Sequence, residues 1–153
     1  MLNKFNSVDA YGQEKVIKVL KDIFSRNNPR FIQHIEDNGR VDIEMYVTDK
    51  NGNEVKYAIE CKDRYMPDWR YNSYIIEDGK IDALTTYSAD GYKPLYINTF
   101  SNDMMYVWDI SNIEYDMIYG KEYHYKTVEE SGTYRKDKKM VRKEDAVWVG
   151  KMK

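Results

Sequence analysis

The sequence predicts one α/β domain built on a mixed central β-sheet that is flanked by helices. Three observations support this fold class: an amphipathic helical pattern near the N-terminus, a pair of alternating strands joined by a turn, and a second helical segment followed by two apolar runs of strand length. They give the order αβββαββ over a core of residues 9–110. Residues 111–153 are expected to form a C-terminal extension with extra strands. The length of 153 residues suits a single domain spanning 1–153.

Composition narrows the class of protein. Although 33% of the residues are charged and the mean hydropathy is -0.80, 14% aromatic residues and regular apolar spacing indicate a folded chain. The formal net charge of -2 excludes a uniformly basic coat for nucleic acid, so such a partner must meet a local patch. The single cysteine, Cys61, cannot form an intramolecular disulfide, the N-terminus lacks the apolar core of a signal peptide, and no apolar run approaches the roughly 20 residues of a membrane span. We expect a cytoplasmic protein with no membrane partner.

A helix is predicted over residues 9–25. Its apolar residues recur with helical spacing at Val16, Ile17, Leu20, Ile23 and Phe24. Ser7 or Asp9 can cap its start, and the segment before Pro29 ends it, because proline disfavours helix in the preceding residue. Glu14 lies away from the centre of the apolar stripe. It is therefore either a solvated side chain or a group that reaches a neighbouring site from the flank.

Three strands follow this helix. Residues 31–36 form a short strand that ends at the turn sequence of residues 37–39, Asp-Asn-Gly. Residues 41–48 and 55–62 alternate strictly, so that each strand has an apolar face and a polar face. The polar faces carry Asp42 and Glu44 in the first strand and Glu60 and Lys62 in the second. The polar faces are the ones that a functional site would use.

The turn between these two strands sets their register, and a slip of one residue moves every side chain to the other face. A two-residue loop, Asn51-Gly52, would place Asp42 opposite Cys61. A three-residue loop over 50–52, ending with glycine in the left-handed region, would place Asp42 opposite Glu60, about 5 Å away at Cβ. We expect the three-residue loop, because two carboxylates at that separation can share one metal ion.

The segment after the hairpin, DRYMPDWRYNSY, mixes arginines with aromatic residues. Arg64, Trp69 and Arg70 in it are candidates for contact with nucleic acid, since arginines meet phosphates and aromatic rings stack on unpaired bases. The aromatic residues can equally pack against the following helix. That helix is predicted over residues 74–88, and two strands follow over residues 92–100 and 104–110.

The C-terminal extension has weaker patterns. Strands are predicted at residues 123–128 and 139–141 around a turn at Ser131-Gly132, with a last short strand at 146–149. The segment RKDKKMVRK, residues 135–143, carries six cations and one aspartate. It is either a solvated charged face or a surface for phosphates that includes Lys136, Lys138 and Lys139.

The polar face of the hairpin suits phosphodiester chemistry. Mg²⁺ prefers hard oxygen ligands, usually one or two carboxylates completed by water and substrate oxygens. Asp42 and Glu60 would supply the two carboxylates. Lys62, two residues after Glu60 on the same face, could orient or help to deprotonate the attacking water. A Lewis acid, an activated water and a nearby cation are what hydrolysis of a phosphodiester requires.

Asp42 in VDIE, Glu60 and Lys62 in IECK, and Glu14 in the preceding helix resemble the motif of the PD-(D/E)XK nuclease superfamily, which includes type II restriction enzymes and Holliday junction resolvases. The core order of that superfamily, αβββαβ, is similar to the order predicted here over residues 9–100. Val41 stands where the motif's name has proline. The resemblance implies a restriction endonuclease-like fold, and it does not extend to the segment after residue 111.

The resemblance also implies roles for individual residues. Asp42 and Glu60 would bind Mg²⁺ or Mn²⁺, the backbone carbonyl of Cys61 and the carboxylate of Glu14 would be further ligands, and Lys62 would serve the water. Lys80, in EDGKIDAL, stands where many members place a residue that faces the site from the second helix, although a surface lysine is the alternative.

The expected function is metal-dependent hydrolysis of phosphodiester bonds, with DNA as the expected substrate. A homodimer would allow such an enzyme to cut two strands, and small nucleases of this type suit phage or bacterial genomes. The alternative is a catalytically inactive, nuclease-like module that binds nucleic acid or protein. A cysteine hydrolase using Cys61 with His34 or His124 is disfavoured, because alternation places Cys61 on the apolar face.

Overall fold

The computed structural model describes the backbone of residues 4–35, 39–124 and 133–152, and the side chains of these residues except those of 4–11 and 120–135. The helices are α1 (Lys4–Ile23) and α2 (Asp78–Ala89). The strands are β1 (Arg30–Gln33), β2 (Ile43–Thr48), β3 (Glu54–Asp63), β4 (Ser73–Ile76), β5 (Lys93–Thr99), β6 (Met104–Asp109), β7 (Asp116–His124), β8 (Thr133–Arg142) and β9 (Trp148–Lys151). Among the described residues, no helix has the length and hydropathy needed to cross a membrane.

Six strands form the main sheet, in the order β1-β2-β3-β5-β6-β9. β3 and β5 run parallel, and the other neighbouring pairs are antiparallel. Parallel neighbours need a crossover connection, and the segment that contains α2 provides it between β3 and β5. The predicted mixed sheet and the order αβββαββ are confirmed, with β4 inserted between β3 and α2.

The start of the second predicted helix is corrected. Residues 73–76 form strand β4, and α2 begins only at Asp78. In β4, Tyr74 and Ile76 are buried while Ser73 and Ile75 are half-buried, which is the two-residue period of a strand. The sequence pattern concealed this boundary, because the apolar residues on both sides of it also fit a helical spacing.

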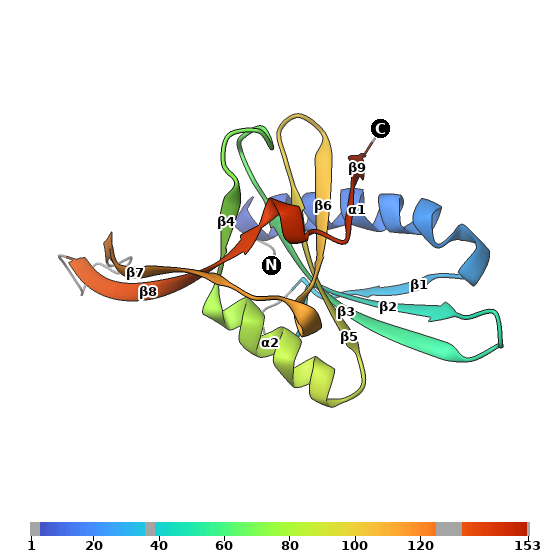
Figure 1. Ribbon diagram of the computed structural model, residues 1–153. Coiled ribbons are helices and arrows are strands. Elements are labelled where there is room, and N and C mark those ends of the chain that lie inside the picture. The colour runs from blue at the N-terminus through green and yellow to red at the C-terminus, as the bar shows by residue number, and fades with distance from the viewer. Residues whose placement is uncertain (1–3, 36–38, 125–132, 153) are drawn as a thin grey trace.

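A second, smaller sheet has the order β4-β8-β7. β4 pairs only with the last four residues of β8, from Lys139 to Arg142. The remainder of β8 pairs with β7 as a two-stranded ribbon that extends away from the body, at the left of Figure 1. The strand predicted at 139–141 is confirmed as part of the longer β8, and the last strand lies at 148–151 rather than 146–149. Of the strand predicted at 123–128, residues 123 and 124 are the end of β7, and residues 125–128 lie outside the described part of the chain. The predicted turn at Ser131-Gly132 lies outside the described residues, as does most of the turn at 37–39.

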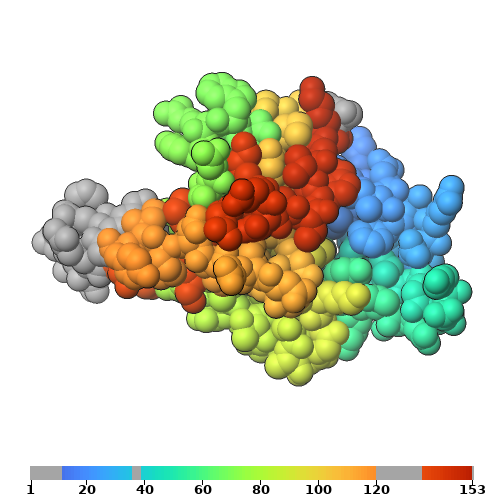
Figure 2. All heavy atoms as spheres, in the orientation of Figure 1, coloured from blue at the N-terminus to red at the C-terminus, as the bar shows by residue number. Residues whose placement is uncertain are grey.

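Figure 2 shows two features that project from the body. One is the base of the ribbon (orange), and the other is the loop between β3 and β4 (bright green, upper left). The loop between β3 and β4 contains Arg64, Trp69 and Arg70, which the sequence marked as candidates for contact with nucleic acid.

The turn between β2 and β3 is the expected three-residue loop. The backbone N–H of Asp49 donates to the carbonyl of Asn53 at 2.8 Å, and that of Gly52 donates to the carbonyl of Asp49 at 3.0 Å. Oδ1 of Asp49 also accepts the backbone N–H groups of Asn51 and Asn53, each at 2.9 Å. Gly52 has a φ of 82°, which is the left-handed conformation that this loop requires.

This loop fixes the register on which the site depends. Ile43 pairs with Ile59 in the β2–β3 ladder. One step further along the two strands, the same register places Asp42 opposite Glu60. The predicted register is confirmed.

Replacing Gly52 by alanine is expected to lower the free energy of unfolding by about 1 kcal/mol, because alanine resists the left-handed region. A Cβ at this position would meet nothing within 4 Å, so the cost is one of backbone strain alone. Gly52→Asn is the matched control and should cost less, since asparagine tolerates that conformation. Urea denaturation of the three proteins measures the difference. Equal stability of wild type and Gly52→Ala would contradict this assignment.

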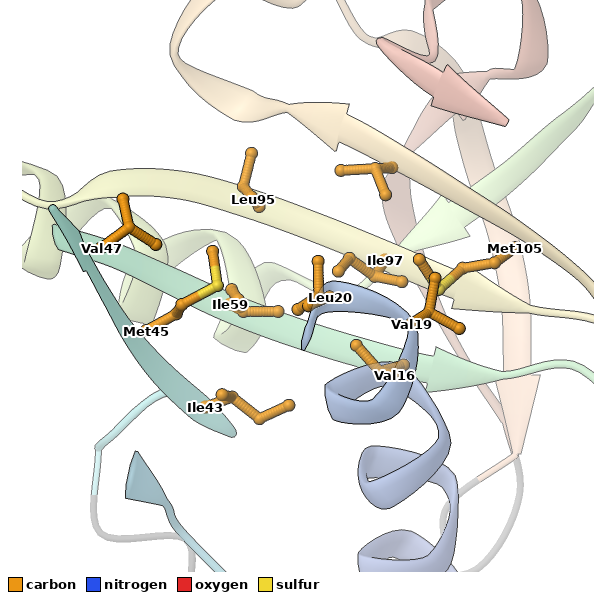
Figure 3. Packing of buried hydrophobic residues seen from close by; sticks show 11 residues of the cluster. Val16, Val19, Leu20, Ile43, Met45, Val47, Ile59, Leu95, Ile97 and Met105 are labelled. Atoms are coloured by element: carbon orange, nitrogen blue, oxygen red, sulfur yellow. The ribbon is translucent and has the colours of Figure 1, made fainter. Parts of the chain in front are cut away.

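Both faces of the main sheet are buried, with α1 on one side and α2 and the small sheet on the other (Figure 1). Figure 3 shows the α1 side, where Val16, Val19 and Leu20 of the helix point toward apolar side chains of β2, β3, β5 and β6. The opposite cluster is rich in aromatic residues and includes Tyr74, Leu84, Tyr96, Phe100, Tyr106 and Trp108. The hairpin is therefore held from both sides, which makes it a rigid base for a site.

Candidate active site

A cavity of about 640 Å³ lies beside the β2–β3 hairpin and receives side chains from both α1 and α2. Four of the residues predicted to carry chemistry line it, namely Asp42, Glu60, Lys62 and Lys80, together with Cys61. The fold therefore brings these predicted residues together from β3, from α2 and from the residue directly before β2.

Asp42 and Glu60 form the acidic centre of the cavity. Oδ2 of Asp42 accepts the backbone N–H of Cys61 at 2.8 Å, which ties this carboxylate to β3. Glu60 is only 4% exposed. Burial raises the pKa of Glu60, while the charge of Lys80 opposes the shift and that of Asp42 adds to it. Two carboxylates this close favour a cation between them.

Lys80 supplies a cation at this place. Its Nζ donates to Oε2 of Glu60 at 2.9 Å and to the carbonyl oxygen of Cys61 at 3.0 Å, and it lies 3.5 Å from Oδ2 of Asp42. Burial disfavours the charged amine, but the two carboxylates outweigh burial and hold the pKa of Lys80 well above its usual range. The predicted position of Lys80, facing the site from the second helix, is what the structure shows.

The three oxygen atoms around Nζ of Lys80 are a suitable donor set for a divalent metal. Two carboxylates and one carbonyl are hard ligands, and Mg²⁺ completes such a set with water and substrate oxygens. The fact that they already surround one cation shows that their lone pairs converge. Within the described ranges, no three His, Cys, Asp or Glu side chains gather to hold a metal, so the carbonyl of Cys61 would be needed as well.

Lys62 lies at the rim of the cavity. Its side chain is 40% exposed, and its Nζ is 3.5 Å from Oε1 of Glu77, at the start of α2. It is thus more exposed than Lys80 and faces solvent, where an amine can approach a water or a phosphate.

The thiol of Cys61 points away from this chemistry. Cys61 packs against the α1 side of the core, as the alternation predicted. Burial raises the pKa of the thiol, and the charge of Asp42 adds to the shift. A buried, protonated thiol is a poor nucleophile.

Glu14 is exposed on α1 and is not among the residues that line the cavity. Its neighbour Gln13 is 6% exposed, lines the cavity, and accepts a hydrogen bond from Nε2 of Gln33 at 2.9 Å. At a helical step of about 100° per residue, one position decides which side chain faces inward. Glu14 therefore stays a prediction without structural support, and α1 presents an amide to the cavity.

His34 is a cavity residue that sequence reasoning did not place there. Its backbone N–H donates to the carbonyl of Asp42 at 2.8 Å, which continues the β1–β2 ladder by one residue. Its Nε2 contacts Oε2 of Glu44. The register between β1 and β2 sets His34 opposite Asp42, and no local pattern in the sequence specified that register.

Glu44 is the centre of a buried hydrogen-bond cluster. Its carboxylate accepts the hydroxyl of Tyr46 at 2.7 Å and that of Tyr92 at 3.0 Å, and Tyr87 lies at 3.5 Å. Burial disfavours ionisation of Glu44, but the hydrogen bonds from Tyr46, His34 and Tyr92 outweigh it and lower its pKa. Glu44 is therefore a satisfied structural carboxylate that orients His34.

The arginines and the tryptophan of the loop after β3 have different environments. Trp69 is 74% exposed, and Arg70 is exposed beside it. Arg64 instead donates inward, to Oδ1 of Asn98 at 2.8 Å and to the carbonyl of Ile75 at 2.6 Å. These bonds use the guanidinium to join β4 to the main sheet, so contact of Arg64 with nucleic acid stays a prediction without structural support.

The lysines of β8 surround an acidic residue of α2. Nζ of Lys136 is 3.0 Å from Oδ2 of Asp78, and this hydrogen bond, together with the charges of Lys138 and Lys139, lowers the pKa of Asp78. Nζ of Lys139 also lies 5.6 Å from the ring centre of Tyr115. The positive charge of these lysines is therefore partly offset by contacts within the protein, with Asp78 and with the ring of Tyr115.

Comparison with known proteins gives a fold and no close relative. No family model and no curated protein matches the sequence. Among solved structures, the chain is similar to Hjc, a Holliday junction resolvase from Archaeoglobus fulgidus, an archaeal hyperthermophile, with a TM-score of 0.51 and 12% identity. The match covers 88% of this chain and 95% of the resolvase. The likeness shows that the chain has a resolvase-like, restriction endonuclease-like fold, as the sequence predicted.

Proposed function

We propose that this chain is a metal-dependent nuclease that hydrolyses phosphodiester bonds of DNA. One observation carries the proposal: Oδ2 of Asp42, Oε2 of Glu60 and the carbonyl of Cys61 converge on a single cation, the amine of Lys80, inside a cavity of about 640 Å³. Fold alone does not assign an activity, so the proposal rests on this site.

Asp42, Glu60 and the carbonyl of Cys61 would hold Mg²⁺ or Mn²⁺. A bound divalent ion would act as a Lewis acid on the phosphoryl group and lower the pKa of water. Glu60 must be ionised for this role, and a divalent charge next to it favours the ionised form. Fixed oxygen donors on two paired strands give the pre-organised geometry that such catalysis needs.

Two lysines complete the proposed machinery. Lys62, at the open rim, would orient the attacking water or, in its neutral amine form, take up the proton that the water loses. Lys80 would balance the two carboxylates while substrate is absent and present its charge to the phosphate when substrate is bound. Their different exposure, 40% for the side chain of Lys62 and 19% for that of Lys80, supports this division of roles.

The substrate surface would include Trp69 and Arg70 in the loop between β3 and β4, and Lys136, Lys138 and Lys139 on β8. DNA is favoured over other phosphodiesters because Hjc, a solved protein of similar fold, is a Holliday junction resolvase. One Asp42–Glu60 centre cuts one strand at a time. We therefore include a homodimer as the form that would cut both strands of a duplex.

Incubation with supercoiled plasmid, single-stranded DNA and RNA tests the proposal. With Mg²⁺ or Mn²⁺ we expect cleavage of DNA, and an excess of EDTA should stop it. Calorimetric titration of the protein with Mn²⁺ should show binding without substrate. If no nucleic acid is cut and no metal binds, the nuclease assignment fails, and a nuclease-like binding module would account for the fold.

A further inference from the structure

The loop between β3 and β4 carries three exposed aromatic side chains within seven residues. Tyr65 is 81% exposed, Trp69 is 74% exposed and Tyr71 is 50% exposed. We call residues 65–71 the aromatic tip, which lies within the bright green projection of Figure 2. A single exposed aromatic residue is ordinary, but several together on one projection mark a surface that meets a partner.

The aromatic tip is held firmly by Asp68. Its carboxylate accepts the amide of Asn102 at 2.6 Å and the hydroxyl of Tyr106 at 2.7 Å. Its carbonyl oxygen accepts the amine of Lys143 at 2.7 Å and the hydroxyl of Tyr74 at 3.3 Å. The loop is thereby tied to the β5–β6 turn, to β6, to the segment after β8 and to β4.

A second connection lies closer to the start of the loop. The backbone N–H of Ser101 donates to the carbonyl of Met66 at 2.9 Å, and the side chain of Met66 packs against the aromatic-rich core. Tyr65 and Trp69 therefore stand directly beside anchored residues. Their exposure follows from a fixed backbone that points them outward.

The rings at the two ends of the tip differ in what they contact. Tyr71 packs edge-on against Tyr74, with ring centres 6.0 Å apart, and Arg70 lies 5.8 Å from the ring of Tyr71. Within the part of the chain that the structure describes, no ring or cation contacts the faces of Tyr65 and Trp69. Two rings thus keep their faces available to a flat partner.

The tip also adjoins the proposed active site. Tyr65 lines the same cavity as Asp42 and Glu60. In the sequence, Lys62 lies between Glu60 and Tyr65. A strand whose phosphate enters the cavity would place its neighbouring nucleotides beside this loop. This shared lining favours the substrate itself, rather than a separate protein, as the partner of the tip.

We propose that Tyr65 and Trp69 form a stacking platform for unpaired nucleobases, so that the chain acts on single-stranded DNA or on splayed and branched ends in preference to closed duplex. The proposal rests on the proposed nuclease function and specifies its substrate class. Bases within a duplex are already stacked on each other and cannot offer a face to either ring. Unpaired bases can, and stacking of this kind tolerates any sequence.

Binding of labelled oligonucleotides without metal tests the platform separately from catalysis. A single-stranded 20-nucleotide oligomer and its duplex are titrated in EDTA with wild type, Tyr65→Ala and Trp69→Ala. Each variant should bind the single strand about tenfold more weakly, which is what the loss of one stacked base predicts, and bind the duplex within about twofold of wild type. Trp69→Phe should retain most of the affinity, because it keeps an aromatic face.

Tyr119 provides the matched control. It is 76% exposed on β7, belongs to neither the aromatic tip nor the lining of the cavity, and loses the same side chain as Tyr65 in an alanine variant. Tyr119→Ala should leave the ratio of single-strand to duplex affinity unchanged. If Trp69→Ala lowers both affinities equally, or if it changes neither, the stacking platform is rejected.

Tryptophan fluorescence gives a second readout. Of the three tryptophans, Trp108 is fully buried and Trp148 is partly buried against the α1 side of the core, so quenching by oligo-dT should come mainly from exposed Trp69 and should fall to the level of these two in Trp69→Phe. The absence of quenching in wild type would overturn the proposal.

Failure of catalysis has a different signature from failure of the platform. A protein that cleaves nothing yet binds single strands through Trp69 would retain the platform and lose the nuclease assignment. If the protein cleaves DNA and Trp69→Ala binds single strands as wild type does, the nuclease assignment is kept and the platform is rejected.

Discussion

Asp42→Asn is expected to lower the rate of metal-dependent DNA cleavage by at least about a hundredfold. Asparagine keeps the size of the side chain, and its carbonyl oxygen can still accept the backbone N–H of Cys61, which the aspartate accepts at 2.8 Å. It removes one of two carboxylates from the donor set, and a divalent ion held by the remaining oxygens is bound more weakly. The rate of plasmid nicking at a fixed Mg²⁺ concentration measures the change.

The same substitution should leave the fold intact. Removing the charge of Asp42 relieves repulsion toward Glu60, so the melting temperature should not fall appreciably. Asp22→Asn, the same change at an exposed position of α1, serves as the control and should cut DNA like wild type. Lys62→Ala should also lose most activity with little change in melting. Wild-type cleavage by Asp42→Asn or by Lys62→Ala would reject the proposed site.

The register of the hairpin could be predicted from sequence because its determinants are local. Asp49, Gly52 and Asn53 close the loop through hydrogen bonds within five residues. Strict alternation on both sides then assigns every side chain to a face. Given the register, the approach of Asp42 to Glu60 follows from strand geometry alone.

Other parts of the site depend on contacts between distant segments, and sequence patterns do not carry these. The inward role of Arg64 is set by Asn98 and by the carbonyl of Ile75, 34 and 11 residues away. Strand β4 exists because the end of β8 pairs with it, and β8 lies more than 60 residues later. A local pattern of apolar residues could not distinguish that strand from the start of α2.

The inward face of α1 shows how precisely sequence periodicity can assign a side chain to a helix face. The apolar stripe placed Glu14 on the flank of the helix, and the structure places Gln13 in the cavity. Periodicity identifies a helix face to within about one residue, which is enough to find the core and too coarse to choose between adjacent polar side chains. His34 was not predicted as a cavity residue for a related reason, since its approach to Asp42 depends on the register between β1 and β2.

Lys80→Met is expected to lower the free energy of unfolding by about 3 kcal/mol, the range found when one partner of a buried ion pair is removed. Methionine preserves the length and apolar stem of lysine, and it leaves Asp42 and Glu60 opposed without a cation. The side chain of Glu60 is only 6% exposed and that of Lys80 is 19% exposed, so water compensates poorly. Urea denaturation in EDTA measures the loss.

Lys62→Met is the matched comparison, because the change is the same and only the position differs. The side chain of Lys62 is 40% exposed and its partner Glu77 is 57% exposed, so this pair should contribute less than about 1 kcal/mol. Equal losses in the two variants would show that Lys80 does not balance the carboxylates.

Stability measured with and without Mn²⁺ should distinguish the contribution of the charge of Lys80 from that of its packing. An ion that binds only the folded protein stabilises it in proportion to the logarithm of its concentration over its dissociation constant. In Lys80→Met the oxygens of Asp42, Glu60 and Cys61 are relieved of a competing amine, so Mn²⁺ should raise the stability of the variant more than that of wild type. A variant that is destabilised and gains nothing from Mn²⁺ would mean that these oxygens are arranged for the amine, and the metal would then have to bind elsewhere in the cavity.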